Sequence, residues 1–314
     1  MVLSRRTLLT CTLFLACSSA APRAVESEPT DEDDEADAAT TEEPKEPIDF
    51  VDAATPPPST KDGGCSAPVD MFIQLDRSTS MATDTYPDGN IGDTHTKWSR
   101  AITALSGYFH STTSTSHAAA LQFFPKKDFT TPMCATGKSY DISRIPGGGL
   151  YKTLPSGAFD NELNAEAPAP VNTLPTPVEA ALRGMITYTA TNRNPGRVTI
   201  GVLITDGSPT ACDWDVDHLA ALIKAHRDAT KIRTYVIGMT GASFPNLEKL
   251  AIAGGGPIHP DNMPGITNAC GGLTSITSCQ HWNVASGDPN VFTAALSAIQ
   301  DSADGCKPGG GVPN

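Results

Sequence analysis

Residues 69–81 read VDMFIQLDRSTSM, a mainly apolar strand pattern that stops at one carboxylate and two alternating hydroxyls, Asp76, Ser78 and Ser80. Such a run is typical of a strand buried on both faces of a sheet. In open α/β sheets, ligands bind in the crevice outside the carboxyl ends of the strands. Three hard oxygen donors at such an end suit Mg²⁺ or Ca²⁺ better than a softer metal. The stretch therefore predicts a cation site at the edge of a parallel sheet.

Strand and helix patterns alternate through the rest of the folded region. Apolar runs predict further strands over 117–125, 197–207, 232–240 and 281–285. Helical spacing of apolar residues, together with helix start and stop signals, predicts helices over 97–110, 178–192, 216–230, 244–253 and 289–303. This alternation predicts an α/β fold with a doubly wound, mainly parallel central sheet flanked by helices.

Two segments, 126–172 and 257–280, fit neither the strand period nor the helix period. Both are rich in glycine or proline, which favours irregular insertions in the sheet-and-helix pattern. We expect a short edge hairpin in the first insertion, near Tyr140 and Tyr151.

Two further oxygen-bearing residues stand at the ends of predicted elements. Thr176 precedes Pro177 at the start of a helix, where a threonine fits the N-cap position and a proline the first helical position. Asp206 follows the most apolar strand pattern of the chain, in a T-D-G turn. A parallel sheet would bring both residues to the edge that carries the first motif.

Together these motifs resemble those of a von Willebrand factor type A (VWA) domain with a complete metal-ion-dependent adhesion site (MIDAS). The resemblance covers about residues 69–305. It is carried by the D-x-S-x-S run at 76–80, the T-x-x-x-x-A-L segment from Thr176 to Leu182, and the T-D-G turn around Asp206. The resemblance implies a Rossmann-like VWA fold and a divalent cation bound at the sheet edge.

The resemblance also implies a role for each of the five residues. Ser78 and Ser80 would bind the cation directly, and Thr176 would do so directly or through water. Asp76 and Asp206 would supply negative charge, mostly through waters. The implied ion is Mg²⁺, which keeps waters and octahedral geometry, with Ca²⁺ or Mn²⁺ as alternatives.

The first 64 residues are expected to lie outside the folded domain. Residues 1–21 combine two arginines with a short apolar run, as in an export signal, and the run is too short to span a bilayer. Residues 14–17, FLAC, resemble a bacterial lipobox, which implies acylation of Cys17; the alternative is an ordinary cleaved signal. Residues 22–64 are rich in Glu, Asp, Thr, Ala and Pro, which predicts a disordered linker.

The negative charge of the chain is concentrated in that linker. Residues 23–62 hold fourteen acidic and three basic residues, a net charge of −11, whereas the whole chain carries −13. Because the export signal contributes +2, residues 63–314 carry only −4. The acidity therefore describes a self-repelling tether, and a slightly acidic domain gives no support to nucleic-acid binding.

Six cysteines lie beyond the export signal: Cys65, Cys134, Cys212, Cys270, Cys279 and Cys306. An even number in an exported domain favours disulfides, although the sequence leaves all fifteen pairings open. A Cys65–Cys306 bond would join the two ends of a domain spanning 65–306. Cys134 and Cys212 each follow a predicted strand, and Cys270 and Cys279 share one loop. The alternative for that loop is zinc bound by Cys270, Cys279 and His281, although no C-x-x-C spacing is present.

These patterns favour a non-enzymatic, exported binding module, held in the cell envelope as an outer-membrane lipoprotein. A partner protein would dock an Asp or Glu side chain on its bound cation. Arg77 and Thr79, the variable letters of the motif, are expected at the exposed rim, where they would help to choose the ligand. The alternatives are a structural scaffold with an unused metal site and a metal-dependent hydrolase. Against the hydrolase, the chain has no G-x-S-x-G elbow and no histidine placed to serve Ser78 or Ser80. Residues 307–314 are expected to form a flexible tail.

Overall fold

The computed structural model describes residues 67–82, 96–125, 134, 141–142, 151–165, 175–274 and 276–304. The expected export signal with Cys17, the acidic linker, the C-terminal tail and the pairing of Cys65 with Cys306 lie outside these ranges. Within them, no helix combines the length and apolarity needed to cross a membrane.

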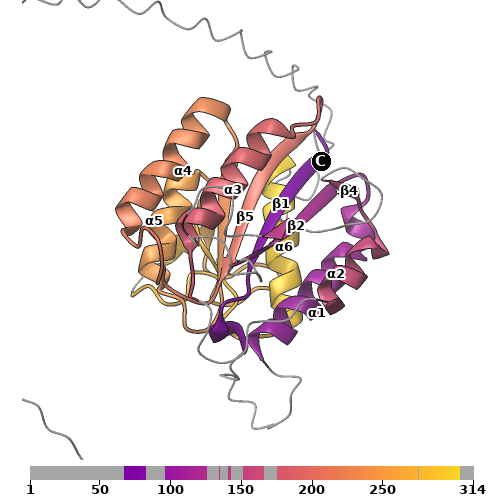
Figure 1. Cartoon of the computed structure of the whole chain (residues 1–314). Helices are drawn as coiled ribbons and strands as arrows, with labels where there is room; N and C mark the ends of the chain where they lie inside the picture. The colour runs from indigo at the N-terminus through magenta and orange to yellow at the C-terminus, as the bar shows by residue number, and fades with distance from the viewer. Residues whose placement is uncertain are drawn as a thin grey trace, which may run out of the picture. The chain divides into compact units, whose positions relative to one another are not determined.

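A seven-stranded sheet forms the centre of the domain (Figure 1), in the order β3-β2-β1-β5-β6-β9, with β4 also pairing with β2. Its strands are β1 (Val69–Asp76), β2 (Ala118–Phe124), β3 (Asp141–Ile142), β4 (Lys152–Thr153), β5 (Val198–Thr205), β6 (Arg233–Gly238) and β9 (Trp282–Asn283). All neighbouring strands from β2 to β9 run parallel, whereas β3 and β4 run antiparallel to β2. The predicted mainly parallel sheet is therefore confirmed.

Helices cover both faces of this sheet, which confirms the doubly wound arrangement. One core contains residues of α1 (Lys97–Phe109), α2 (Asp160–Ala165) and α6 (Pro289–Asp304), and the other contains residues of α3 (Val178–Thr191), α4 (Val216–Thr230) and α5 (Phe244–Gly254). The central strand β1 contributes to both cores because successive side chains of a strand point to opposite faces. Ile73 and Leu75 thus belong to the first core, and Phe72 to the second.

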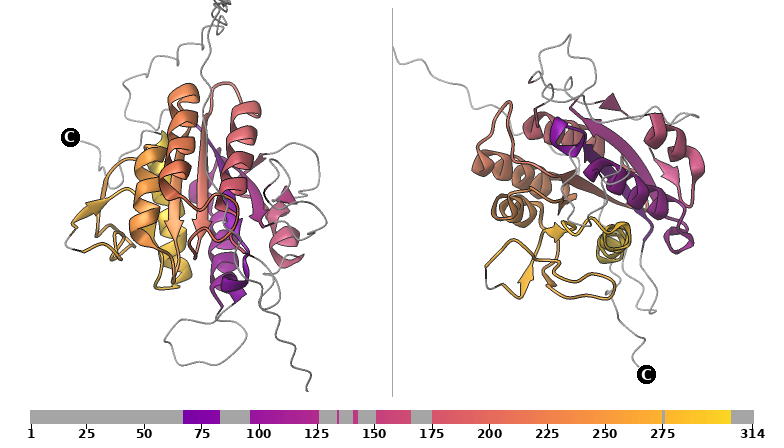
Figure 2. Two further views of the ribbon diagram at one scale, coloured as in Figure 1. Left: turned by 60° about the vertical axis from the view of Figure 1, so that its left-hand side comes forward. Right: turned by 90° about the horizontal axis from the view of Figure 1, so that it is seen from below.

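The two insertions contain more structure than the sequence indicates. Tyr140 lies outside the described residues; within them, β3 and β4 each pair with β2 and not with each other, so they do not form the expected hairpin. A bare edge strand exposes unpaired backbone groups, and these two short strands cover that edge of β2. The second insertion holds a separate two-stranded sheet of β7 (His259–Pro260) and β8 (Ser278–Cys279). Figure 2 shows this orange-to-yellow segment on the side of the domain away from β4.

The close crossing of α5 over β6 yields a test of the packing. A methyl group at Gly254 would lie 1.9 Å from the Thr234 carbonyl oxygen, so Gly254→Ala should lower the free energy of unfolding by about 1–3 kcal/mol. The control is Gly107→Ala in α1, where the methyl group would lie 3.5 Å from Thr293 Oγ1. That variant should keep or gain stability, by up to about 1 kcal/mol. Urea denaturation measures both, and an unchanged stability of Gly254→Ala would contradict the close crossing.

Candidate functional site

Asp76 closes β1 at the carboxyl edge of the sheet, the lower edge in Figure 1. The parallel register pairs Leu75 with Ile204, so the end of β1 lies beside Thr205 at the end of β5. Thr205 Oγ1 donates a hydrogen bond to Asp76 Oδ2 at 2.6 Å, and the backbone N–H of Ser78 donates to Oδ1 at 2.7 Å. The buried carboxylate of Asp76 is therefore held through both of its oxygens.

The two serines of the motif connect this strand end to Asp206. Ser78 Oγ lies 3.0 Å from Ser80 Oγ, and Ser80 Oγ donates to Asp206 Oδ1 at 2.8 Å. A short 3₁₀ turn, η1 (Thr79–Ala82), follows Ser78 and brings the two hydroxyls to the same side. Ser78 and Asp206 are buried, whereas Ser80 is partly exposed.

Thr176 reaches the same place from the segment before α3. A methyl group at Gly207 would lie 3.5 Å from Thr176 Oγ1 and 3.9 Å from Ser80 Oγ, so both hydroxyls lie against this glycine. The backbone of Thr176 is fixed by Thr210, whose hydroxyl accepts from the Thr176 N–H at 2.8 Å and whose own N–H donates to the Thr176 carbonyl at 3.1 Å. The expected N-cap role of Thr176 is wrong, because Pro177 is the N-cap of α3 and no side chain caps the helix.

Lys97, which the sequence marks only as the start of a helix, lies beside Asp206. Lys97 Nζ is 2.6 Å from Asp206 Oδ2, and the two side chains are 5% and 0% exposed. Asp206 thus divides its oxygens between Ser80 and Lys97. One signal could have drawn attention to Lys97, because the dipole of a helix disfavours a cation in its first turn.

Arg77 does not lie at an exposed rim, and the expectation that it chooses a ligand is wrong. Its side chain is 1% exposed, and its Nε donates to the Pro125 carbonyl oxygen at 2.6 Å. Its backbone N–H donates to the Phe124 carbonyl oxygen at 2.7 Å, and its guanidinium lies 6.0 Å from the centre of the Phe123 ring. Arg77 therefore ties the turn after β1 to the end of β2. Thr79, in contrast, is partly exposed and lies near the surface.

Burial and charge act on the two carboxylates differently. Burial raises the pKa of Asp76 from its ordinary 3.8 to about 7, and the nearby Asp206 carboxylate adds to the rise. Hydrogen bonds from Thr205 and Ser78 favour the charged form and oppose the shift. At pH values below 7, Asp76 therefore holds a proton, whereas Asp206 has the ammonium of Lys97 beside it.

The residues present fit a hard divalent cation. We name Asp76, Ser78, Ser80, Thr176 and Asp206 the five-oxygen site, since each contributes side-chain oxygen and the structure gathers all of them at one edge of the sheet. Carboxylate and hydroxyl oxygens are the ligands of Mg²⁺ and Ca²⁺, and the set contains no sulfur or imidazole that would favour a softer metal. The Lys97 ammonium paired with Asp206 shows that the site accommodates positive charge.

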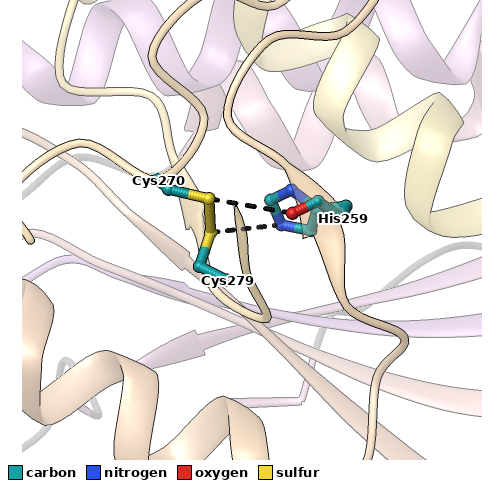
Figure 3. Close-up of side chains that lie close together, drawn as sticks. All are labelled: His259, Cys270 and Cys279. Carbon is teal, nitrogen blue, oxygen red and sulfur yellow. Dashed lines mark hydrogen bonds between the residues drawn. A yellow bond between two sulfur atoms is a disulfide. The ribbon is translucent and has the colours of Figure 1, made fainter. Parts of the chain in front are cut away.

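A second cluster contradicts the zinc alternative. Cys270 and Cys279 form a disulfide with a sulfur–sulfur distance of 2.05 Å, so neither offers the thiolate that zinc needs. Figure 3 shows that His259 faces these sulfurs, with its Nε2 lying 3.7 Å from Cys279 Sγ. His281 instead directs its Nδ1 to Glu248 Oε2 at 2.7 Å. The placement of the two cysteines in one loop thus reflects a disulfide.

The loop that follows Asp206 is fastened at two points. Cys212 forms a disulfide with Cys134, and the backbone N–H of Asp213 donates to Glu179 Oε2 at 2.9 Å. Glu179 stands in the first turn of α3, three residues after Thr176 in the chain. The segments that carry Thr176 and Asp206 are therefore held to each other away from the hydroxyl groups themselves.

The comparisons with known proteins give structures of low sequence identity. No protein-family model and no curated protein matches the chain. Among solved structures, proximal thread matrix protein 1 from the mussel byssus (crystal form 2) is similar at 13% identity, with a TM-score of 0.45. A structure of the same mussel protein with a zinc-occupied MIDAS motif has 11% identity and a TM-score of 0.44, and the PilB minor pilin from Streptococcus sanguinis has 12% and 0.44.

Each of these matches covers 76% of this chain. The matched region spans 48% of the mussel protein and 61% of the pilin, so this chain corresponds to part of each. At this level of similarity, the function must be inferred from the geometry of the five-oxygen site itself.

The raised pKa of Asp76 predicts how cation binding depends on pH. The metal-free fold holds the Asp76 proton more tightly than the unfolded chain does, so this group's contribution to stability falls as pH rises from about 4 to about 7. A cation must displace that proton. The apparent dissociation constant for Mg²⁺ should therefore rise about tenfold per pH unit below 7 and level off above it. Calorimetry at pH 5.5, 6.5 and 7.5, in buffers of different ionisation enthalpy, measures the affinity and the released proton.

Asp76→Asn is the matched control for this titration. It keeps the size of the side chain but cannot release the proton, so its residual cation affinity should not vary over the same pH range. A wild-type affinity that stays constant from pH 5.5 to 7.5 would show that Asp76 is not protonated in the metal-free protein.

Proposed function

We propose that this domain is an exported, membrane-tethered binding module of the VWA type, which uses a divalent cation, Mg²⁺, to dock a carboxylate of a partner protein. The observation that supports it is the convergence of three oxygen-bearing segments at one sheet edge. Asp76 ends β1 and is followed by the two serines, Asp206 follows β5, and Thr176 precedes α3. A structural role alone does not require five such side chains to meet.

Each residue of the five-oxygen site has a part in this function. Ser78, Ser80 and Thr176 would hold the cation through their hydroxyl oxygens, and Asp76 and Asp206 would supply negative charge. Bound Mg²⁺ would offer a coordination position that a partner's Asp or Glu can take. Thr205 keeps Asp76 in place, and the disulfide of Cys212 steadies the loop after Asp206.

An exposed aromatic residue offers a contact for a protein partner. Trp214 lies on the segment between Asp206 and α4 and is 70% exposed. Exposed aromatic residues are enriched at the centre of protein–protein interfaces. Trp214 would give the partner an apolar contact, while the acidic linker and Cys17 would hold the module at the envelope.

Two histidines of α4 have structural partners. His226 is buried, and its Nε2 lies 3.1 Å from Thr189 Oγ1, between α4 and α3. His218 is exposed, and its Nδ1 lies 3.2 Å from Asp213 Oδ2. These contacts favour packing and surface roles, in keeping with a module that binds and does not catalyse.

Ser78→Ala tests the proposal with the least disturbance of the fold, because it removes one hydroxyl and keeps the backbone N–H that holds Asp76. Immobilised wild-type protein should retain a partner from envelope extract when Mg²⁺ is present and lose it in chelator. With the purified partner, Ser78→Ala should weaken binding at least tenfold, or about 1.4 kcal/mol.

The matched control is Ser106→Ala, a serine on α1 about 14 Å along the helix axis from Lys97. It should bind the partner as the wild type does. Partner binding that persists in excess chelator would refute the cation-dependent function. Binding that requires Mg²⁺ but is unchanged by Ser78→Ala would place the cation elsewhere. A partner whose affinity changes neither with Mg²⁺ nor with Ser78→Ala would favour the scaffold alternative.

A further inference from the structure

Lys97 lies where a cation site needs negative charge. Its ammonium is 2.6 Å from Asp206 Oδ2, on the carboxylate whose other oxygen accepts from Ser80. A buried lysine is costly unless it is paired, and here the pairing carboxylate belongs to the five-oxygen site. The Lys97 ammonium therefore neutralises negative charge of Asp206 that would otherwise attract the cation.

The surrounding chain is shaped to hold this ammonium. Lys97 is the first residue of α1, after the N-cap Thr96, although the helix dipole disfavours a cation there. Gly241, in the loop after β6, has a φ of +95°, a conformation that glycine adopts readily. A methyl group at Gly241 would lie 3.2 Å from Lys97 Nζ and 3.2 Å from the Asp206 carbonyl oxygen. Three segments of the fold thus enclose the ion pair.

We propose that Lys97 is a built-in counterion of the five-oxygen site. It lowers the affinity of the site for a divalent cation and leaves the loaded site with a net positive charge that attracts a partner's carboxylate. This inference rests on the proposed cation-binding function and assigns a role to a residue outside the five ligands.

The charges of the groups in contact explain both effects. Ionised Asp76 and Asp206 alone would balance the charge of a divalent cation and leave the loaded site neutral. With Lys97 present, the loaded site carries one net positive charge, so a carboxylate is attracted to it. The same ammonium repels the incoming cation, and repulsion between charges a few ångströms apart is strong where water is excluded. Lys97 thus weakens cation binding and strengthens partner docking.

Lys97→Met in the full chain tests this role, because methionine approximates the length of lysine without its charge. Calorimetry with MgCl₂ and MnCl₂ at pH 7.5 should give a dissociation constant at least tenfold lower than that of the wild type. The control is Lys249→Met, which removes the same charge from an exposed side chain paired with Asp217 on the surface. Its dissociation constant should stay within about twofold of wild type, since exposed charges are screened by salt.

A second variant, Lys97→Gln, guards against misfolding, and circular dichroism in chelator checks both. Folded variants that bind Mg²⁺ no more tightly than the wild type would overturn the role of Lys97 and leave the cation function standing. If wild type and variants all fail to bind, both proposals fail. If the variants bind Mg²⁺ and the wild type does not, the role of Lys97 is supported and the proposed cation function of the wild type is refuted. If both variants unfold in chelator, their refolding on addition of Mg²⁺ supports the role of Lys97, because tight binding to the folded state stabilises it. Variants that stay unfolded in Mg²⁺ overturn the role.

Discussion

The parallel pairing of β1 with β5 is the constraint on which the five-oxygen site depends. These central strands end side by side, so Asp76 receives a hydrogen bond from Thr205, 129 positions away in the chain. Asp206 follows Thr205 directly and meets Ser80 across the same edge. Because β1 is buried on both faces, a shift in register would move apolar side chains out of both cores. The burial that stabilises the sheet thus also fixes where the two carboxylates lie.

Much of the sheet and the oxygen ligands could be predicted from the sequence, for a physical reason. Apolar runs mark buried strands, strand and helix alternation implies parallel pairing, and parallel strands share one carboxyl edge. Asp76 and Asp206 therefore had to lie at the same edge once their strands were recognised. The order of the strands, with β1 between β2 and β5, is known only from the structure.

Other features depended on contacts that no local pattern reports. Thr176 has the sequence of an N-cap, yet its tertiary contact with Thr210 sets its position and the helix begins uncapped. Arg77 looks like a surface residue inside a loop motif, but it is buried against the end of β2. Lys97 reaches Asp206 from an element 109 positions away, and only its helix position hinted at a special environment. In each case a long-range partner overrode the local preference.

The protein's own groups can neutralise the two buried carboxylates of the site. Near and below pH 7, a proton on Asp76 removes one negative charge, and the ammonium of Lys97 balances the other on Asp206. Binding of a cation at this site would therefore be an exchange, in which the Asp76 proton leaves and the charge of Lys97 must be overcome or displaced. This exchange explains how a stable fold can carry two adjacent acidic groups in its interior, where unpaired charges are costly. Cation binding is therefore predicted to depend on pH.

Anomalous diffraction from crystals grown with MnCl₂ at pH 7.5 tests the central claim most directly, because manganese scatters anomalously and prefers the oxygen ligands of Mg²⁺. The predicted result is one anomalous peak at the carboxyl edge of the sheet, in contact with the hydroxyl oxygens of Ser78 and Ser80. An edge without a peak, with Lys97 still on Asp206 and the serine hydroxyls still bonded to each other, would contradict the assignment of a cation site.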